Sequence, residues 1–521
     1  MRLQYYVNVV IPGASMQFGT GLTRAFRRWE LLHLNIPSAL MSNSAFWRSH
    51  KRLGFDKSHS SQLFTKYVRP GDRRNFLQII PALATALLMC LGTLAEADLH
   101  QPETVQATGT ISLSPLPQSI PLSADFTVTA NNEVVPVQHY RDRNVAIFSA
   151  QAKVVLKIKI NVSIEQYSIH PTSFGLKGTV EADTLTLSLT PTLFDPQPAY
   201  LLIKINNLEI LVVLVDPPEE NVPSPHDPGV QDVADSVYAA DQTGKVLATI
   251  PIQSAIDQAS LSGGGIVYVP PGLYRVQSLI IKSGVTLYLA AGAVIQGTDR
   301  IADFAGDVAY RVSSKKDLPP VIEVTDYKSV AIRGRGLIDA ADTVIYNGNT
   351  TPEEVEPKGP YHRVAVRVSN GDGFTVDGVT LLDSAGWSLF VNRVENIRIT
   401  RLKLLGPMWS GNDGIDICGQ NAVVDNCFVY TGDDNFCTKA VHANYPVHDI
   451  HFNNSVGYSN SGGVKVGMQV LSEQSEICFD NVDIIHAGRG LVVESRAQSD
   501  GGDQTPCPIQ NVYFTDIRVE Q

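Results

Sequence analysis

The stretch FTVDGVTLLDS (residues 374–384) opens a series of similar segments that continues to the end of the chain. Each segment has two or three β-forming residues, then a polar residue that is often Asp or Asn, then a second β-forming run. The later members are IRITRLKLLGP (397–407), AVVDNCFVYTG (422–432), IHFNNSVGYSN (450–460), ICFDNVDIIHA (477–487) and VYFTDIRVEQ (512–521). Their starts step by 23, 25, 28, 27 and 35 residues, with no helical stretch between them. A drifting period of this size predicts a parallel β-helix, in which each coil stacks on the one before.

The chain from about residue 98 onward also has the composition of an all-β protein. Period-two runs between about 98 and 215, separated by Pro, Asn and Gly turns, predict an N-terminal β-sandwich domain. A charged, Pro-rich linker follows at 216–235, and the β-helix is expected over 236–521, with one small helix in PIQSAIDQAS (251–260). The last repeat stops at Gln521 with no capping element, so we expect a chain truncated at its C-terminus.

The N-terminal 97 residues are expected to lie outside the folded domains. Residues 73–97 combine an arginine pair, a short Pro-interrupted apolar run and a small-residue ending, which is typical of a signal peptide, with a single membrane anchor as the alternative. Residues 1–72 would then be a long leader or a mis-assigned start. The sequence therefore predicts a secreted or periplasmic protein.

Charge and cysteine content exclude several classes of partner and cofactor. The chain has a net charge of −11, and residues 1–98 carry +7, so the remainder carries −18. Such an acidic surface disfavours nucleic acid and anionic membranes as partners. The cysteines beyond Cys90 match no zinc spacing and are interpreted as core thiols, with a single disulfide after export as the alternative. No cofactor and no metal site is predicted.

Two short segments concentrate acidic residues about one repeat apart. GNDGIDICG (411–419) carries Asp413 and Asp416, and TGDDNFCTKA (431–440) carries Asp433 and Asp434. Strands of neighbouring coils lie roughly 4.8 Å apart, so residues one repeat apart become neighbours on the same face. Paired carboxylates repel and shift each other's pKa, which is costly unless the pair is used. Cleavage of a glycosidic bond needs such a pair, one carboxyl to donate a proton and one to activate water or attack the sugar.

Aspartates also serve as turn residues in β-helices, and this alternative is weighed for each position. We expect Asp416, and Asp377, Asp425 and Asp480 in the repeat frame, to be turn residues. We expect the doublet Asp433–Asp434 to be functional, because adjacent strand residues point to opposite faces and a charged doublet has no place in the core.

From about residue 240 to the end, the chain resembles glycoside hydrolase family 28, the polygalacturonases and their relatives. The resemblance is carried, in order, by GGGIVYVPPGLYRVQSLIIKSGVTLYLAAGAVIQG, NDGIDI, TGDDNFCTK and GGVKVG (462–467). It implies a right-handed parallel β-helix of the pectin lyase-like superfamily and an inverting hydrolase of pectin- or polygalacturonan-like polysaccharides. It further implies that Asp433 is the general acid, while Asp413 and Asp434 hold and deprotonate the attacking water.

The chain departs from the family pattern in two places. Pectin-cleaving members carry Gly-His-Gly where this chain has Ser461, Gly462 and Gly463. Their Arg-x-Lys, which grips the galacturonate carboxylate one coil later, is replaced here by GLVVESR (490–496). The candidate substrate-binding residues are cations and neighbours of these motifs, each weighed against a surface or core role: Trp387, Lys439, Lys465, Arg489, Glu494 and Arg496.

Three other functions stay open at this point. An N-terminal β-sandwich ahead of a β-helix also resembles the dextranases of glycoside hydrolase family 49, which would suit a neutral glucan. A non-catalytic carbohydrate-binding β-helix or adhesin is disfavoured by the Asp433–Asp434 doublet. A polysaccharide lyase would want a calcium cluster and an Arg or Lys base, which the sequence does not assemble.

Overall fold

The structure, a computed structural model, describes residues 5–7, 110–190, 197–304, 318–341, 363–499, 502–503 and 506–521. These residues belong to one compact unit, which comprises Met1–Gly13 and Gln106–Gln521. The predicted leader, apart from β1 (Tyr5–Val7), and the predicted signal peptide lie outside the described residues. Among the residues that are described, no helix is both long and apolar enough to cross a bilayer.

The predicted sandwich forms between residues 111 and 216. One sheet has five antiparallel strands in the order β4 (Glu133–Val135), β3 (Thr127–Ala130), β7 (Val154–Lys159), β10 (Thr184–Leu189) and β9 (Gly178–Glu181). The other has the order β2 (Ile111–Leu113), β6 (Arg143–Ala150), β12 (Ile210–Asp216), β11 (Ala199–Ile205) and β8 (Tyr167–His170), with β5 (Gln138–Tyr140) paired to β6. The alternating residues of facing strands meet in one apolar core, as in Leu156, Leu187 and Val213. The turn η3 (Thr172–Phe174) follows β8.

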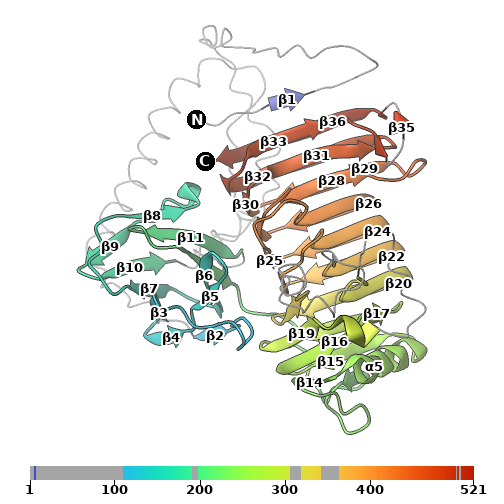
Figure 1. The fold of residues 1–521 in the computed structure, drawn as a ribbon, viewed down its shortest axis with the longest axis horizontal. Helices are drawn as coiled ribbons and strands as arrows, with labels where there is room; N and C mark the ends of the chain where they lie inside the picture. The colour runs from blue at the N-terminus through green and yellow to red at the C-terminus, as the bar shows by residue number, and fades with distance from the viewer. Residues whose placement is uncertain are drawn as a thin grey trace, which may run out of the picture. The chain divides into compact units, whose positions relative to one another are not determined.

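The second domain is a right-handed parallel β-helix, as predicted. Figure 1 shows its strands stacked as rungs from β14 to β36, with α5 (Thr249–Leu261) at the end where the first coils lie. The first coils are formed by β13 (Val230–Asp232), β14 (Thr243–Leu247), β15 (Gly265–Val269), β16 (Gly272–Val276), β17 (Leu279–Ile281), β18 (Val285–Leu289) and β19 (Ala293–Gly297), followed by η4 (Ile301–Phe304). Because β13 already pairs with β15, the helical sheet begins before the predicted boundary at residue 236.

The later coils each combine a long strand with one or two short strands. They consist of β20 (Ile322–Gly334), β21 (Leu337–Asp339), β22 (Val366–Asp377), β23 (Thr380–Leu382), β24 (Leu389–Thr400), β25 (Lys403–Leu405), β26 (Ile415–Asp425), β27 (Phe428–Thr431), β28 (Phe436–Ala440), β29 (Val447–Asn453), β30 (Val456–Ser459), β31 (Gly462–Val470), β32 (Gln474–His486), β33 (Arg489–Glu494) and β36 (Ile509–Val519). A hairpin of β34 (Gln498–Ser499) and β35 (Gly502–Asp503) follows β33, and β1 pairs antiparallel with β36.

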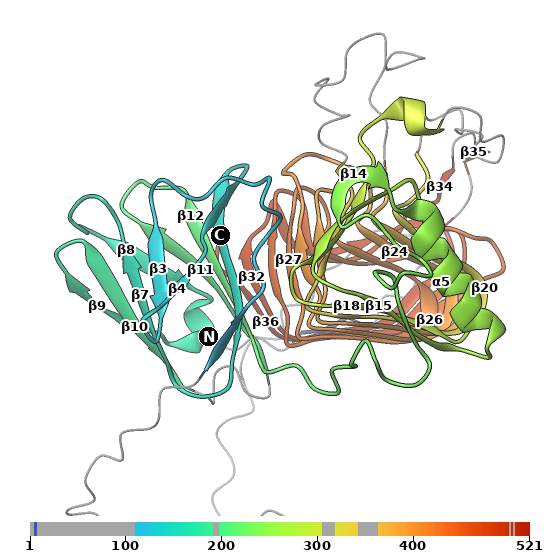
Figure 2. The same cartoon turned by 90° about the horizontal axis from the view of Figure 1, so that it is seen from below.

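Three ladders of parallel strands run along the helix. Figure 2 shows the coils in a view down the direction in which they stack. One passes through β20, β22, β24, β26, β29, β32 and β36, a second through β21, β23, β25, β27 and β30, and a third through β26, β28, β31 and β33. The register places like residues on top of one another: the rings of Phe452, Phe479 and Phe514 stack with centroids 4.9 and 5.3 Å apart. The core is therefore a column of stacked apolar side chains, which the repeat spacing predicted.

The third ladder decides where the candidate residues point. Inward positions of β28 and β31, such as Phe436 and Val464, are paired in register and fully buried. The residues that alternate with these inward positions point to the outer face of the sheet. The strand register there puts Cys437 of β28 next to Lys465 of β31, and the Gly467 position next to Glu494 of β33. Polar side chains from successive strands therefore gather on one outer face of the coils.

Candidate active site

Three successive turns bring the predicted aspartates together. Asp413 precedes β26, Asp433 and Asp434 lie between β27 and β28, and Ser461 lies between β30 and β31. Backbone hydrogen bonds tie the turns to one another: Gly414 N donates to the Asp434 carbonyl (2.8 Å) and Asp433 N to the Asn412 carbonyl (3.1 Å). One carboxylate oxygen from each of Asp413, Asp433 and Asp434 lies within 4.8 Å of the others. The expected meeting of acids 20 residues apart is therefore confirmed.

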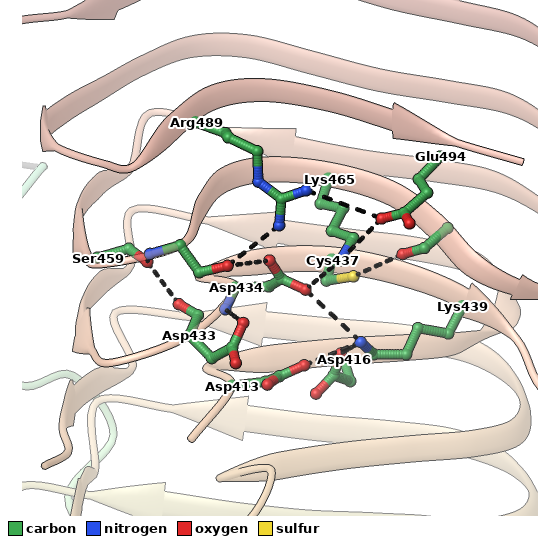
Figure 3. A network of polar contacts seen from close by, with 12 residues as sticks. Asp413, Asp416, Asp433, Asp434, Cys437, Lys439, Ser459, Lys465, Arg489 and Glu494 are labelled. Carbon is green, nitrogen blue, oxygen red and sulfur yellow. Dashed lines mark hydrogen bonds and ion pairs between the residues drawn. The ribbon is translucent and has the colours of Figure 1, made fainter. Parts of the chain in front are cut away.

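All nine residues that the sequence singled out line one cavity, whose volume is about 790 Å³. They are Trp387, Asp413, Asp433, Asp434, Lys439, Lys465, Arg489, Glu494 and Arg496. Figure 3 shows the acids of the central turns and the two lysines beneath Arg489 and Glu494, which come from the next coil. This volume lies in the range of small-molecule and sugar-binding clefts, so the cavity has room for part of a polymer chain.

Asp433 is the most exposed of the three central carboxylates. Its Oδ2 accepts hydrogen bonds from the backbone N–H of Gly411 (2.7 Å) and from the hydroxyl of Ser410 (3.2 Å). Burial alone would raise the pKa of Asp433, but these hydrogen bonds to the ionised form outweigh it and lower the pKa below its ordinary value. In the free protein Asp433 is therefore held as a carboxylate at the edge of the cavity.

Asp413 lies deeper, only 3% exposed, against Lys439. The Lys439 ammonium donates to Asp413 Oδ2 at 2.8 Å. Burial nevertheless raises the pKa of Asp413 to about 6; Lys439 opposes this shift, and the neighbouring Asp434 and Asp433 charges add to it. Asp413 thus binds a proton more readily near neutral pH than Asp433 does, whose pKa is lowered.

Asp416 corrects the sequence prediction. It is not a turn residue but lies within β26, fully buried, with Oδ1 3.3 Å from Lys439 Nζ. Burial raises its pKa well above the ordinary value. The alternation Ile415–Asp416–Ile417 was the signal that was missed, because a polar residue between two inward isoleucines must point to the same outer face as the other acids.

Lys439 and Lys465 likewise are not solvated surface charges. Each is at most 3% exposed, and the Lys465 ammonium donates to Asp434 Oδ2 at 2.7 Å. Burial disfavours a charged ammonium, but the surrounding carboxylates dominate and raise the pKa of both lysines. The acidic cluster is close enough to hold a cation, yet these two ammonium groups already neutralise much of its charge.

The remaining wall of the cavity is formed by Glu494, Arg489, Arg496 and Trp387. Glu494 lies 3.6 Å from Lys465, 3.9 Å from Arg489 and 3.2 Å from Arg496. Trp387 packs edge-on against Phe390 with ring centroids 4.8 Å apart. Lys439 Nζ lies 4.6 Å from the centroid of the indole ring of Trp387. The indole therefore both covers the buried lysine and faces the cavity.

Asparagines that the sequence analysis did not single out brace the three turns. Asn412 donates to the Gly386 carbonyl (3.0 Å) on the preceding coil, and Asn435 donates to Thr431 Oγ1 (2.9 Å) and the Tyr458 carbonyl (3.1 Å). Both side chains are fully buried. Their position directly before Asp413 and directly after Asp434 was the available signal, because a bent backbone next to a charged doublet needs side-chain partners.

Stacked coils that place acids from successive turns in one cavity define the class of parallel β-helix proteins with a polar site on the outer face. Within this class, residues 281–521 match the model of the glycosyl hydrolases family 28. The resemblance stated from the sequence is therefore confirmed.

The chain is similar to several named proteins. It is 29% identical to the exo-poly-alpha-D-galacturonosidase of Dickeya chrysanthemi over 220 residues, which covers 37% of this chain and 35% of that protein. It is 23% identical to rhamnogalacturonase A of Aspergillus aculeatus over 242 residues, 46% of this chain and 49% of that one. The matches thus span about half or less of these relatives' length.

A solved structure extends the similarity of fold to more of the chain. Dex49A from Penicillium minioluteum superposes with a TM-score of 0.51 at 13% identity, covering 78% of this chain and 80% of that one. This similarity concerns the fold alone.

The five cysteines among the described residues are free thiols, and Cys418, Cys427 and Cys437 are buried, in agreement with the core-thiol interpretation.

Proposed function

We propose that this protein is a glycoside hydrolase that cleaves a pectic polysaccharide with inversion at the anomeric carbon. The observation that carries the proposal is the convergence of Asp413, Asp433 and Asp434 in one open cavity. Carboxyl pairs are the groups with which most glycosidases work. The family match and the names of the relatives, a galacturonosidase and a rhamnogalacturonase, support a pectic substrate.

The three carboxyls differ in exposure, and this difference supports separate roles. Asp433 lies at the edge of the cavity, where it reaches a glycosidic oxygen, and acts as general acid. Asp413 and Asp434 lie beneath it, each held by a lysine ammonium, and they orient the attacking water and accept its proton. The lysines keep these two groups fixed, because a charge-assisted hydrogen bond restricts the carboxylate in both distance and direction.

The order of pKa values in the free protein is the reverse of what the acid and base roles require. The pKa of Asp433 is lowered, whereas that of Asp413 is raised to about 6. The coupled pair nevertheless holds one proton between its two titrations, and catalysis needs only that this proton reside on Asp433 when the polymer is bound. A polymer that displaces water from Asp433 raises its pKa and favours that arrangement.

A secreted or periplasmic location is part of the proposal. Polysaccharides of this kind lie outside the cell, and residues 73–97 have the pattern of a signal peptide.

The test is a turnover assay on polygalacturonate, rhamnogalacturonan and dextran. Release of reducing ends without absorbance from unsaturated products is expected on a pectic substrate. Asp433→Asn is expected to abolish this release with little change in melting temperature, because Asp433 does not belong to the apolar core. Asp449→Asn, which changes an exposed aspartate outside the cavity, is the matched control and should retain full activity.

The stereochemistry of the product tests the inverting mechanism. Proton NMR of the first-formed reducing ends should show the anomer opposite to the bond that was cleaved. Inverting enzymes commonly separate their two carboxyls by roughly 6.5–9.5 Å, further than the closest oxygens of this cluster. Retention would therefore assign Asp413 or Asp434 a nucleophilic role and overturn the inverting mechanism. Glycan binding with no cleavage of any polymer would overturn the enzyme proposal itself.

A neutral glucan is the second candidate substrate. Glu494, a carboxylate in the wall where pectin-cleaving members place cations, favours it. Faster hydrolysis of dextran than of either pectic polymer would support this alternative.

A further inference from the structure

Glu494 is the meeting point of three cationic side chains. Its Oε2 lies 3.6 Å from the ammonium of Lys465 and 3.9 Å from the guanidinium of Arg489, and its Oε1 lies 3.2 Å from the guanidinium of Arg496. Figure 3 shows the carboxylate of Glu494 above Lys465, turned toward the end of the Arg489 side chain. Glu494 is therefore the carboxylate that all three cations of this wall share, although Lys465 lies closer to Asp434.

The two arginines are the cations that an incoming sugar would meet first. Their side chains are 52% and 62% exposed, whereas Lys465 is buried and already donates to Asp434 at 2.7 Å. Arg489 also donates to the hydroxyl of Ser461 (3.2 Å). An acidic sugar at this wall would thus depend on the two guanidinium groups for its recognition.

Glu494 lies against the two exposed guanidinium groups that a sugar carboxylate at this wall would need. Its side chain is 23% exposed, it lines the cavity, and the strand pairing of β33 with β31 sets Glu494 beside Gly467. A second carboxylate would meet both the repulsion of Glu494 and competition for its partners. A sugar that carries only hydroxyl groups meets neither obstacle, because hydroxyls donate hydrogen bonds to a carboxylate.

We propose that Glu494 is a specificity-determining residue, which makes this wall of the cavity accept a neutral sugar and exclude a uronate. The inference rests on the proposed function and deepens it. The substrate would be a polymer that places a neutral unit against β33, either one that alternates neutral and acidic sugars or one that is wholly neutral. An unbroken polygalacturonate would be a poor ligand.

The test is calorimetric binding of three probes to the full chain carrying Asp433→Asn, which stops turnover. The probes are an oligogalacturonate, a rhamnogalacturonan oligosaccharide and an isomalto-oligosaccharide. Adding Glu494→Gln, which keeps the shape and removes the charge, should raise affinity for oligogalacturonate roughly tenfold relative to the other two, as expected for one gained charge-assisted hydrogen bond. The gain should shrink at about 1 M salt, where surface charges are screened.

Arg496→Gln supplies the matched control. With Glu494 in place it should change oligogalacturonate binding little, because the guanidinium is already engaged; combined with Glu494→Gln it should cancel most of the gain. An unchanged ratio of affinities among the three probes in the Glu494→Gln form would overturn the inference, as would equal loss of all three. These measurements do not depend on turnover. If the protein cleaves a polysaccharide but its substrate preference is the same with Glu494→Gln, this inference alone is wrong. If the protein binds the probes but cleaves no polysaccharide, the proposed function is wrong.

Discussion

Lys439 is the residue on which the acidic cluster depends most. Its ammonium lies 2.8 Å from Asp413, 3.3 Å from Asp416 and 3.8 Å from Asp434. The sequence suggested a substrate-binding or a surface residue, but the burial of Lys439 beneath Trp387 indicates that it acts on the carboxyls instead. We therefore regard it as a positioning residue that also sets the proton affinity of Asp413.

Replacement of Lys439 by Met should move the pH profile upward. The proposed mechanism requires one proton on the Asp413–Asp433 pair of the free protein, so kcat/KM should fall as pH rises through the pKa of Asp413, about 6. Because the ammonium favours ionised Asp413, its removal raises that pKa, and the alkaline limb should shift to higher pH. The measurement is the pH dependence of kcat/KM on the best substrate.

Lys439→Arg is the control, because it keeps the positive charge and should leave the alkaline limb near its original position. A limb that stays in place in Lys439→Met, or that moves to lower pH, would contradict the assignment of Asp413 to this titration. A circular dichroism spectrum of each variant separates the effect from misfolding.

At the scale of the element, the turns of the β-helix are held by a row of asparagines. Asn426, Asn454 and Asn481 adopt left-handed backbone conformations on successive coils, with φ of 56°, 47° and 55°. Asn454 donates to Asp425 Oδ1 and accepts from Asn481, both at 2.7 Å. Asp425 is the last residue of β26 and not itself in a turn, but its carboxylate supports the left-handed Asn454, and this row lies outside the cavity.

Asn454→Ala should destabilise the fold without affecting catalysis. Loss of two side-chain hydrogen bonds and of a residue that tolerates the left-handed region should lower the free energy of unfolding by about 2–3 kcal/mol. Denaturant unfolding measures this change. Asn454→Gly keeps the backbone freedom and loses only the side chain, so it should lose less. Equal losses in the two variants would show that the backbone conformation contributes nothing.

For the whole molecule, the described residues include a buried polar contact between the sandwich and the β-helix. Asp216, at the end of β12, accepts hydrogen bonds from Lys403 of β25 (2.5 Å) and from the Tyr200 hydroxyl (3.0 Å), and all three side chains are at most 1% exposed. Burial lowers the pKa of Lys403, against the attraction of Asp216. One apolar cluster also contains residues of both domains, among them Leu202 of the sandwich and Leu405 of the β-helix. The two domains therefore share a core.

Lys403→Met should cost about 3–5 kcal/mol of unfolding free energy, because it leaves Asp216 as a buried charge without its closest cation. The double variant Asp216→Asn with Lys403→Met removes both charges and keeps an acceptor for Tyr200, so it should lose distinctly less. Chemical denaturation of both forms measures the difference. Equal losses would mean that packing of the lysine stem, not the charge of Asp216, is what matters.

The fold was predictable because every coil of a stack needs the same pattern of inward apolar residues and turn residues. The period of 23 to 35 residues and the alternation in runs such as IHFNNSVGYSN indicated both the coils and the inward residues, and Phe452 stacks where the repeat places it. The start of the helix was predicted too late. The three residues of β13 follow a Pro-rich stretch and carry no repeat pattern, so only their pairing with β15 reveals them.

The site was predictable in its members but not in its electrostatics. All nine candidate residues line the cavity, because the motif spacing fixes which turns stack. Burial of Lys439 and Lys465, and the inclusion of Asp416, depended on how far side chains from adjacent strands reach across the sheet. The sequence pattern does not contain that information, because a lysine that is buried against a carboxylate of the next coil and a solvent-exposed lysine can have the same sequence context.

The cavity draws its acids from the turns before β26 and β28 and its arginine wall from β33, so chemistry and preference are inherited from separate coils. With the roles proposed above, substitutions within residues 489–496 are expected to change the sugar that is bound and to leave the carboxyls of residues 413–434 unaltered. In this architecture, substitutions in the last coils could therefore change the preferred substrate while the carboxyls of the central turns are kept.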